Sequence, residues 1–158
     1  MVLLLLLFIP VGLLLSFAFA GYSFGTLGRI GLRRADRETW FRCLAAFLAA
    51  VAAAVYTWGL LVVGLAVLDA EDGGAGSSPL QPCRTPGQWE RALHVVGYTV
   101  DYVPLRFVCE TKDGGSYAAE SVPGYVDPAA LGFALAAVVC VGAAALGSEH
   151  RTGKGPAG

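Results

Sequence analysis

Two cysteines, Cys83 and Cys109, carry the most definite chemistry that the sequence offers. They lie in one polar stretch of a chain with four cysteines, and no Cys-x-x-Cys pair supports a thiol-exchange enzyme. Two cysteines in an oxidising compartment form an even number and can pair. The sequence therefore predicts a Cys83–Cys109 disulfide. Cys43 and Cys140 fall in or beside apolar segments, and we expect both to be small buried thiols.

The other polar side chains with possible chemistry are His94, Arg106 and Glu110. Arg106 and Glu110 share one face of an expected strand, about 13 Å apart along it, which is too far for direct contact. A single histidine cannot form a structural zinc site without further ligands. We predict no catalytic residue, no metal site, no cofactor and no enzyme activity. The alternative is an accessory subunit of a membrane transporter or enzyme that uses these three residues as a polar cluster.

Short strands are expected to position the two cysteines. Val95–Val103 is rich in Val, Tyr and Thr, and Pro104 then breaks the run or confines it to a sheet edge. The next strand places three side chains on one face, namely Leu105, Phe107 and Cys109. Lys112–Gly115 predicts a turn into a strand over Ser116–Val122. A short helix is expected within Pro86–Leu93. So small a core is marginal by itself, which gives the disulfide a stabilising role.

Aromatic residues are dense in this stretch, and at this density they suit recognition of a partner. The candidate partner surface comprises Trp89, Tyr98, Tyr102, Arg106 and Tyr117. In a domain of this size several aromatic residues must also belong to the core.

Apolar segments on both sides of the polar stretch identify the fold class. Hydrophobic residues make up 56% of the 158 residues and charged residues only 15%. About 20 helical residues cross a hydrocarbon core roughly 30 Å thick. We predict three transmembrane helices and a small extracytoplasmic β-rich (α+β) domain stapled by one disulfide. The expected order is helix 1–24, basic loop 25–42, helix 43–68, flexible linker 69–79, external domain 80–127, helix 128–147 and tail 148–158.

Basic residues between the first two spans predict the orientation. The loop holds Arg29, Arg33, Arg34, Arg37 and Arg42, and basic residues near membrane ends remain cytoplasmic. The N-terminus and the domain are then outside, and the tail is cytoplasmic, in a multi-pass protein of the plasma membrane. Two alternatives are a cleaved signal peptide ending near Ala20 and an amphipathic helix over Leu27–Phe41 lying on anionic lipid.

Sequence features at both ends of the external domain predict how it joins the neighbouring spans. Asp69, Glu71 and Asp72 lack the spacing of a calcium loop and are expected in a solvated linker. Asp127–Pro128 is a helix start, with Asp127 as the N-cap.

The composition of the spans excludes several functions. None of them contains Asp, Glu, Lys, Arg or His, which disfavours transport by this chain alone. A net charge of −1 does not indicate nucleic-acid binding. Small residues recur every four positions on the spans, which favours close helix packing and possible self-association; they are Gly12, Ser16 and Ala20, then Ala45, Ala49 and Ala53, then Gly132, Ala136, Cys140 and Ala144.

Three segments, Tyr102–Cys109, Asp113–Tyr117 and Val122–Pro128, resemble those of uncharacterised small integral membrane proteins of high-GC Gram-positive bacteria. The resemblance implies a three-span envelope protein and assigns no activity or ligand. We expect a non-enzymatic membrane protein that contacts lipid and whose external domain binds an envelope partner or accompanies an envelope complex.

Overall fold

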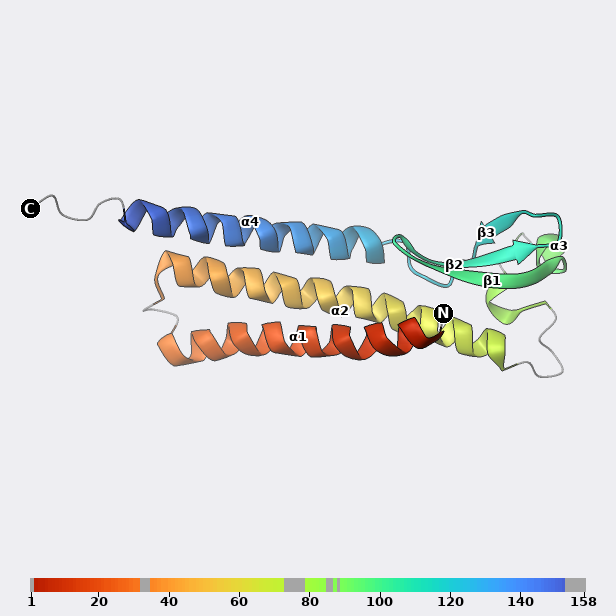
Figure 1. The fold of residues 1–158 in the computed structure, drawn as a ribbon, viewed down its shortest axis with the longest axis horizontal. Coiled ribbons are helices and arrows are strands. Elements are labelled where there is room, and N and C mark those ends of the chain that lie inside the picture. Colours follow the sequence, from red (N-terminus) through yellow and green to blue (C-terminus); the bar gives the residue numbers. More distant parts are fainter. Residues whose placement is uncertain (1, 32–34, 73–78, 85–86, 88, 153–158) are drawn as a thin grey trace, which may run out of the picture. The chain divides into compact units, whose positions relative to one another are not determined.

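The computed structural model describes residues 2–31, 35–72, 79–84, 87 and 89–152. Long helices and a small sheet make up the fold (Figure 1). The elements in chain order are α1 (Val2–Ile30), α2 (Arg37–Glu71), the 3-10 helix η1 (Gln81–Cys83), α3 (Trp89–Ala92), β1 (Val95–Tyr102), β2 (Leu105–Thr111), β3 (Ser116–Ala118) and α4 (Val126–Thr152). They form two compact units, one of residues 1–10 and 56–128, the other of residues 11–55 and 129–158.

Within the described residues, three helices are long and apolar enough to cross a membrane, in the segments Leu3–Ile30, Arg37–Glu71 and Val126–Gly147. This agrees with the expected number of apolar helices. Each helix is nevertheless longer than the sequence suggested. The reason is that flanking Arg, Glu and Thr residues continue a helix once it has been nucleated, because extension adds one hydrogen bond per residue.

The expected basic loop 25–42 is mostly helical. α1 continues to Ile30, and Gly31 follows it with φ of +78°, a conformation that glycine adopts readily. Arg29 lies in the last turn of α1, and α2 begins at Arg37, with an ion pair of 2.6 Å between Arg42 and Glu38. A single amphipathic helix over Leu27–Phe41 is therefore wrong. Arg33 and Arg34 lie outside the described residues.

Small residues line the helices of the second unit. Ala45 and Ala50 are buried, and Ser23 donates a hydrogen bond of 3.0 Å to the carbonyl of Cys43. Cys43 is a buried free thiol as expected, whereas Cys140 is only partly buried. The expectation that both are buried thiols is therefore wrong for Cys140.

The sheet is antiparallel with the order β1-β2-β3. Residues alternate as expected in β2: Leu105, Phe107 and Cys109 are buried, while Arg106 and Glu110 are exposed. β1 and β2 form a hairpin in which Tyr102 pairs with Leu105, so the loop consists of Val103 and Pro104, joined by a cis peptide bond. Pro104 thus belongs to a two-residue turn, where it need not donate a ladder hydrogen bond.

Several boundaries of the expected domain change. The strand over Ser116–Val122 is only three residues long, and the helix within Pro86–Leu93 has only four. The tail is helical as far as Thr152, and residues 153–158 are not described. Of the expected linker, residues 73–78 lie outside the described part, while Asp69 and Glu71 belong to α2.

The core of the first unit combines the sheet with the last turns of α2. Phe107, Leu105, Leu60, Val63 and Val126 are all at most 1% exposed. The closest approach is at Gly59, where an added Cβ would lie 2.7 Å from side-chain carbons of both Leu105 and Val126. The absence of a side chain at this position lets the start of β2 and the start of α4 meet α2. Residues 79–125, which pack against α2 and the start of α4, are called the module below.

Candidate functional site

Side-chain hydrogen bonds attach the module to α2 and α4. Tyr56 donates its hydroxyl to the carbonyl of Tyr102 at 2.7 Å, and Tyr98 donates to Oε1 of Glu71 at 2.5 Å. The Leu105 amide lies 3.1 Å from both carboxylate oxygens of Asp127. Asp127 therefore accepts from β2 within the first turn of α4, and the expectation that it is the N-cap is wrong because the helix begins at Val126. These bonds attach the hairpin at its turn and at Tyr98.

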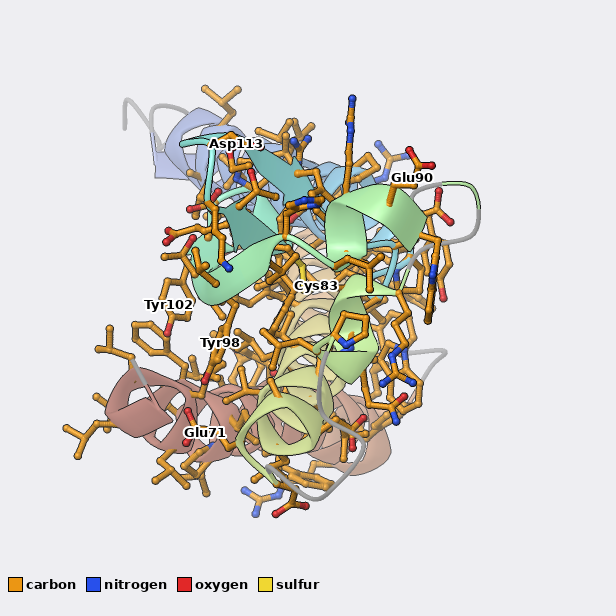
Figure 2. All side chains as sticks on the ribbon, turned by 90° about the vertical axis from the view of Figure 1, so that its right-hand side faces the viewer. Glu71, Cys83, Glu90, Tyr98, Tyr102 and Asp113 are labelled. Carbon is orange, nitrogen blue, oxygen red and sulfur yellow. A yellow bond between two sulfur atoms is a disulfide. The ribbon has the colours of Figure 1, made fainter. Side chains whose placement is uncertain are left out.

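Tyr98 connects the sheet to the end of α2, as Figure 2 shows by the neighbouring positions of Tyr98 and Glu71. Its ring stacks on Phe107 with centroids 5.0 Å apart and an interplanar angle of 15°. Burial, followed by the hydrogen bond to Glu71 and the negative charge of that residue, raises the pKa of Tyr98 from 10.0 to about 12. Glu71, which was expected in a solvated linker, thus accepts a hydrogen bond from the sheet.

Tyr98→Phe is expected to loosen this attachment while preserving the stacked ring. Losing one hydrogen bond should lower the free energy of unfolding of the module by about 0.5–1.5 kcal/mol. Because the folded pKa of Tyr98 is raised, the wild-type contribution is complete below pH 10 and is lost as the pH rises towards 12. Denaturant unfolding of wild type and variant from neutral to alkaline pH measures this. Their difference should shrink above pH 10, and a constant difference would contradict the assignment.

The disulfide between Cys83 and Cys109 forms as predicted, with a Cα–Cα distance of 6.1 Å, and both residues are fully buried. A second contact reinforces it: Tyr117 donates its hydroxyl to the Cys83 carbonyl at 2.8 Å. Burial raises the pKa of Tyr117, and the positive charge of Arg91 partly opposes this. The segment around Cys83 is therefore held to β2 by the bridge and to β3 by a tyrosine.

The candidate partner surface separates into two groups. Tyr98, Tyr102 and Tyr117 are partly buried and use their rings, hydroxyls or carbonyls within the first unit. Trp89, at 55% exposure, and Arg106 remain accessible. The sequence could not distinguish the two groups. A tyrosine that anchors a sheet and a tyrosine that binds a partner can occupy the same position in an alternating strand pattern.

A polar pocket of about 500 Å³ lies where α3 meets the turn between β2 and β3. Figure 2 labels Glu90 and Asp113, which lie on the side of the module away from Glu71. The lining residues are Glu90, Arg91, His94, Thr111, Asp113, Gly115, Ser116 and Tyr117. His94 Nδ1 lies 2.9 Å from the Glu90 carbonyl, and the Lys112 amide donates to the His94 carbonyl. The pocket thus carries charges of both signs, with Glu90 and Arg91 from α3 and Asp113 from the β2–β3 turn.

Exposed apolar side chains occur in the same chain segment as Glu90, Arg91 and His94 of this pocket. Trp89, Leu93 and Val96 are 55%, 57% and 58% exposed, respectively. The Leu93 amide donates to the Trp89 carbonyl, so these two residues are one helical turn apart on α3. The sequence reading selected Trp89 and missed Leu93 and Val96, although the spacing of four between Trp89 and Leu93 is a visible signal. These three residues are called the Trp89 patch.

The polar cluster of His94, Arg106 and Glu110 does not assemble. Arg106 pairs with Asp101 next to the hairpin turn, whereas His94 precedes the opposite end of β1. His94 and Asp101 are seven positions apart, which is about 23 Å at the usual rise of a strand. The pocket that contains His94 includes neither Arg106 nor Glu110. The structure thus separates Arg106 from His94, whereas Glu110 pairs with Gly97 at the end of β1 that follows His94.

The arrangement offers recognition chemistry: a tryptophan and two aliphatic side chains beside a charged rim. Among the described residues, no three His, Cys, Asp or Glu side chains are grouped so as to hold a metal ion. No protein-family model, curated protein or solved structure matches the chain.

Proposed function

We propose that this chain is a three-span membrane protein of the bacterial envelope whose disulfide-stapled module binds a protein partner outside the cell. The Trp89 patch is the single observation that carries the proposal. Its three apolar side chains are each more than half exposed. Isolated exposed apolar residues are ordinary, but a tryptophan with neighbouring aliphatic residues and a charged rim has the composition of an interface centre.

The polar pocket supplies the rim of this interface. Glu90, Arg91 and His94 belong to the same short segment as Trp89 and Leu93, and Asp113 approaches from the β2–β3 turn. Charges of both signs around an apolar centre give orientation and specificity more than affinity. This favours a protein surface with complementary charges over a purely apolar ligand. The proposed role is non-enzymatic.

Membrane insertion and orientation are part of the proposal. The three apolar helices support insertion, and arginines at the α1–α2 connection support its cytoplasmic position. This orientation exposes the module to an oxidising exterior, which suits its disulfide. The lipid bilayer and the envelope partner would then bind different parts of the chain. The proposal includes self-association through the small-residue faces of the helices.

Site-specific photo-crosslinking in intact cells of the native host tests the proposal. A photoreactive residue at Leu93 should give one adduct of defined mass, whereas the same residue at exposed Asp101, near the opposite end of β1, should not. Trp89→Ala should weaken capture about 30-fold, since truncation of a central interface tryptophan removes about 2 kcal/mol. Equal adducts at both positions, or none at Leu93, would contradict a partner at the patch.

Orientation is measured in the same cells by a membrane-impermeant maleimide, in a background with Cys43 and Cys140 replaced by alanine. Leu93→Cys should react in intact cells, and Asp36→Cys only after permeabilisation. The reverse pattern would exclude the proposed orientation. It would not affect the crosslinking result, which tests partner binding separately.

A further inference from the structure

The turn of the β1–β2 hairpin lies beside the first residues of α4. A Cβ at Gly59 of α2 would lie 2.7 Å from side-chain carbons of both Leu105 and Val126, and Asp127 accepts the Leu105 amide. Tyr56 binds the carbonyl of Tyr102 from the same part of α2. The turn therefore reaches the level of residues 56–59 of α2, well before that helix ends at Glu71.

The length of α4 determines where a membrane would begin. Its apolar segment, Val126–Gly147, has 22 residues. At 1.5 Å per residue this is about 33 Å, close to a hydrocarbon core roughly 30 Å thick. Almost the whole segment is needed to cross, so the boundary of the bilayer must lie near Val126. That position is next to the hairpin turn.

The tryptophans of α2 give the same boundary independently. Trp40 and Trp58 are 43% and 57% exposed on one continuous helix. They are separated by about 27 Å of helical rise, and tryptophan is enriched at both membrane–water interfaces. Tyr125, 62% exposed, directly precedes α4 and adds a further aromatic residue near this level. On the face that carries the sheet, α2 is thus expected to leave the hydrocarbon near Trp58 and not at Leu68.

The sheet itself cannot enter the hydrocarbon. β1 is an edge strand, so part of its backbone lacks a ladder partner, and open sheet edges do not occur in lipid. Asp101 and Arg106, paired across the strands next to the turn, are both exposed. Charged side chains are costly in the bilayer interior and suit the headgroup region. Only the turn can reach the membrane.

We propose that the hairpin turn, residues 102–105, is a lipid-contact site in the headgroup region of the outer leaflet. Val103, 89% exposed, is the apolar contact. Interfacial aromatic groups near this level are Tyr102 in the turn, Trp58 next to Gly59 and Tyr125 next to Val126, and the exposed Arg106 directly follows the turn. The turn thereby fixes the height of the module, and of the Trp89 patch, above the bilayer. This site rests on the membrane insertion proposed above.

Spin labels at three positions test the lipid contact in the full-length protein with its disulfide intact. Cysteines replace Val103 at the turn, Leu135 in the middle of α4 and Val96 at the far end of β1, all in a background with alanine at positions 43 and 140. These three residues are 89%, 58% and 58% exposed, so labelling should not disturb packing. The protein is placed in vesicles of phosphatidylethanolamine and phosphatidylglycerol. Collision rates with oxygen, which partitions into lipid, and with a water-soluble nickel chelate are then compared.

The label at Leu135 should collide with oxygen and be protected from nickel, and the label at Val96 should show the opposite. The label at Val103 should fall between them, with nickel collisions reduced several-fold relative to Val96. If Val103 matches Val96 while Leu135 is in lipid, the turn does not touch the membrane and this inference is wrong. Lipid exposure of both Val103 and Val96 would also overturn it. If Leu135 is in water, membrane insertion itself fails.

Discussion

Cys83→Ser is expected to destabilise the module by about 3–4 kcal/mol, because the bridge closes a 26-residue separation and restricts the unfolded chain. The contribution is comparable to the whole stability of a domain this small. The loss should be local. The segment from Cys83 to Val95 should open, while the long helices keep their structure. Limited trypsin digestion measures this as faster cleavage after Arg84 and Arg91 in the variant than in the wild-type protein.

Cys140→Ser provides the matched control, since Cys140 is a free thiol outside the module. It should digest like the wild-type protein, and reduced wild type should digest like Cys83→Ser. Tyr117 also holds the Cys83 carbonyl, so some order in this segment will persist without the bridge. Unchanged cleavage in Cys83→Ser would mean that packing and this hydrogen bond, not the disulfide, hold the segment.

Gly59→Ala is expected to separate the hairpin from α2. The added Cβ would lie 2.7 Å from carbons of Leu105 and Val126, both of which are almost fully buried and have little space to move. Overpacking of this kind typically destabilises by about 1–3 kcal/mol, which outweighs the gain of roughly 1 kcal/mol from replacing a helical glycine by alanine. Thermal or denaturant unfolding of the module reports the difference.

Gly64→Ala on the same helix is the control for helix propensity. Its nearest heavy atom, Cδ1 of Ile9, would be 3.7 Å away, an ordinary contact. This variant should be as stable as the wild-type protein or more stable. If both variants behave alike, the close approach at Gly59 does not position the sheet.

Local sequence patterns predicted much of the secondary structure of this protein, and its disulfide. Apolar runs fixed the number of long helices because helix length and hydrophobicity are properties of contiguous residues. Alternation in Leu105–Glu110 identified the buried face of β2, and the glycines after Lys112 identified its turn. The disulfide followed from an even number of cysteines in one polar stretch. Each of these signals lies within a few residues or needs only a count.

Helix ends were less predictable, because a turn of helix at the end of an apolar run depends on what it contacts. α2 continues through Asp69 to Glu71, where Tyr98 supplies a hydrogen bond. Asp127 has the residue type of an N-cap but accepts from the Leu105 amide. In both cases the partner is more than 20 residues away in the chain, beyond the range of any local pattern.

The roles of the aromatic residues were decided by the tertiary structure alone. In the sequence, Trp89 and Tyr98 are equally plausible parts of a partner surface. The fold stacks Tyr98 on Phe107 and connects it to α2, while Trp89 stays exposed beside Leu93 and Val96. Gly59 likewise has no distinguishing mark within its apolar run, yet it is where two other elements meet α2. Sequence specifies which side chains are apolar or aromatic, but exposure depends on which surfaces meet, and that is set by long-range packing.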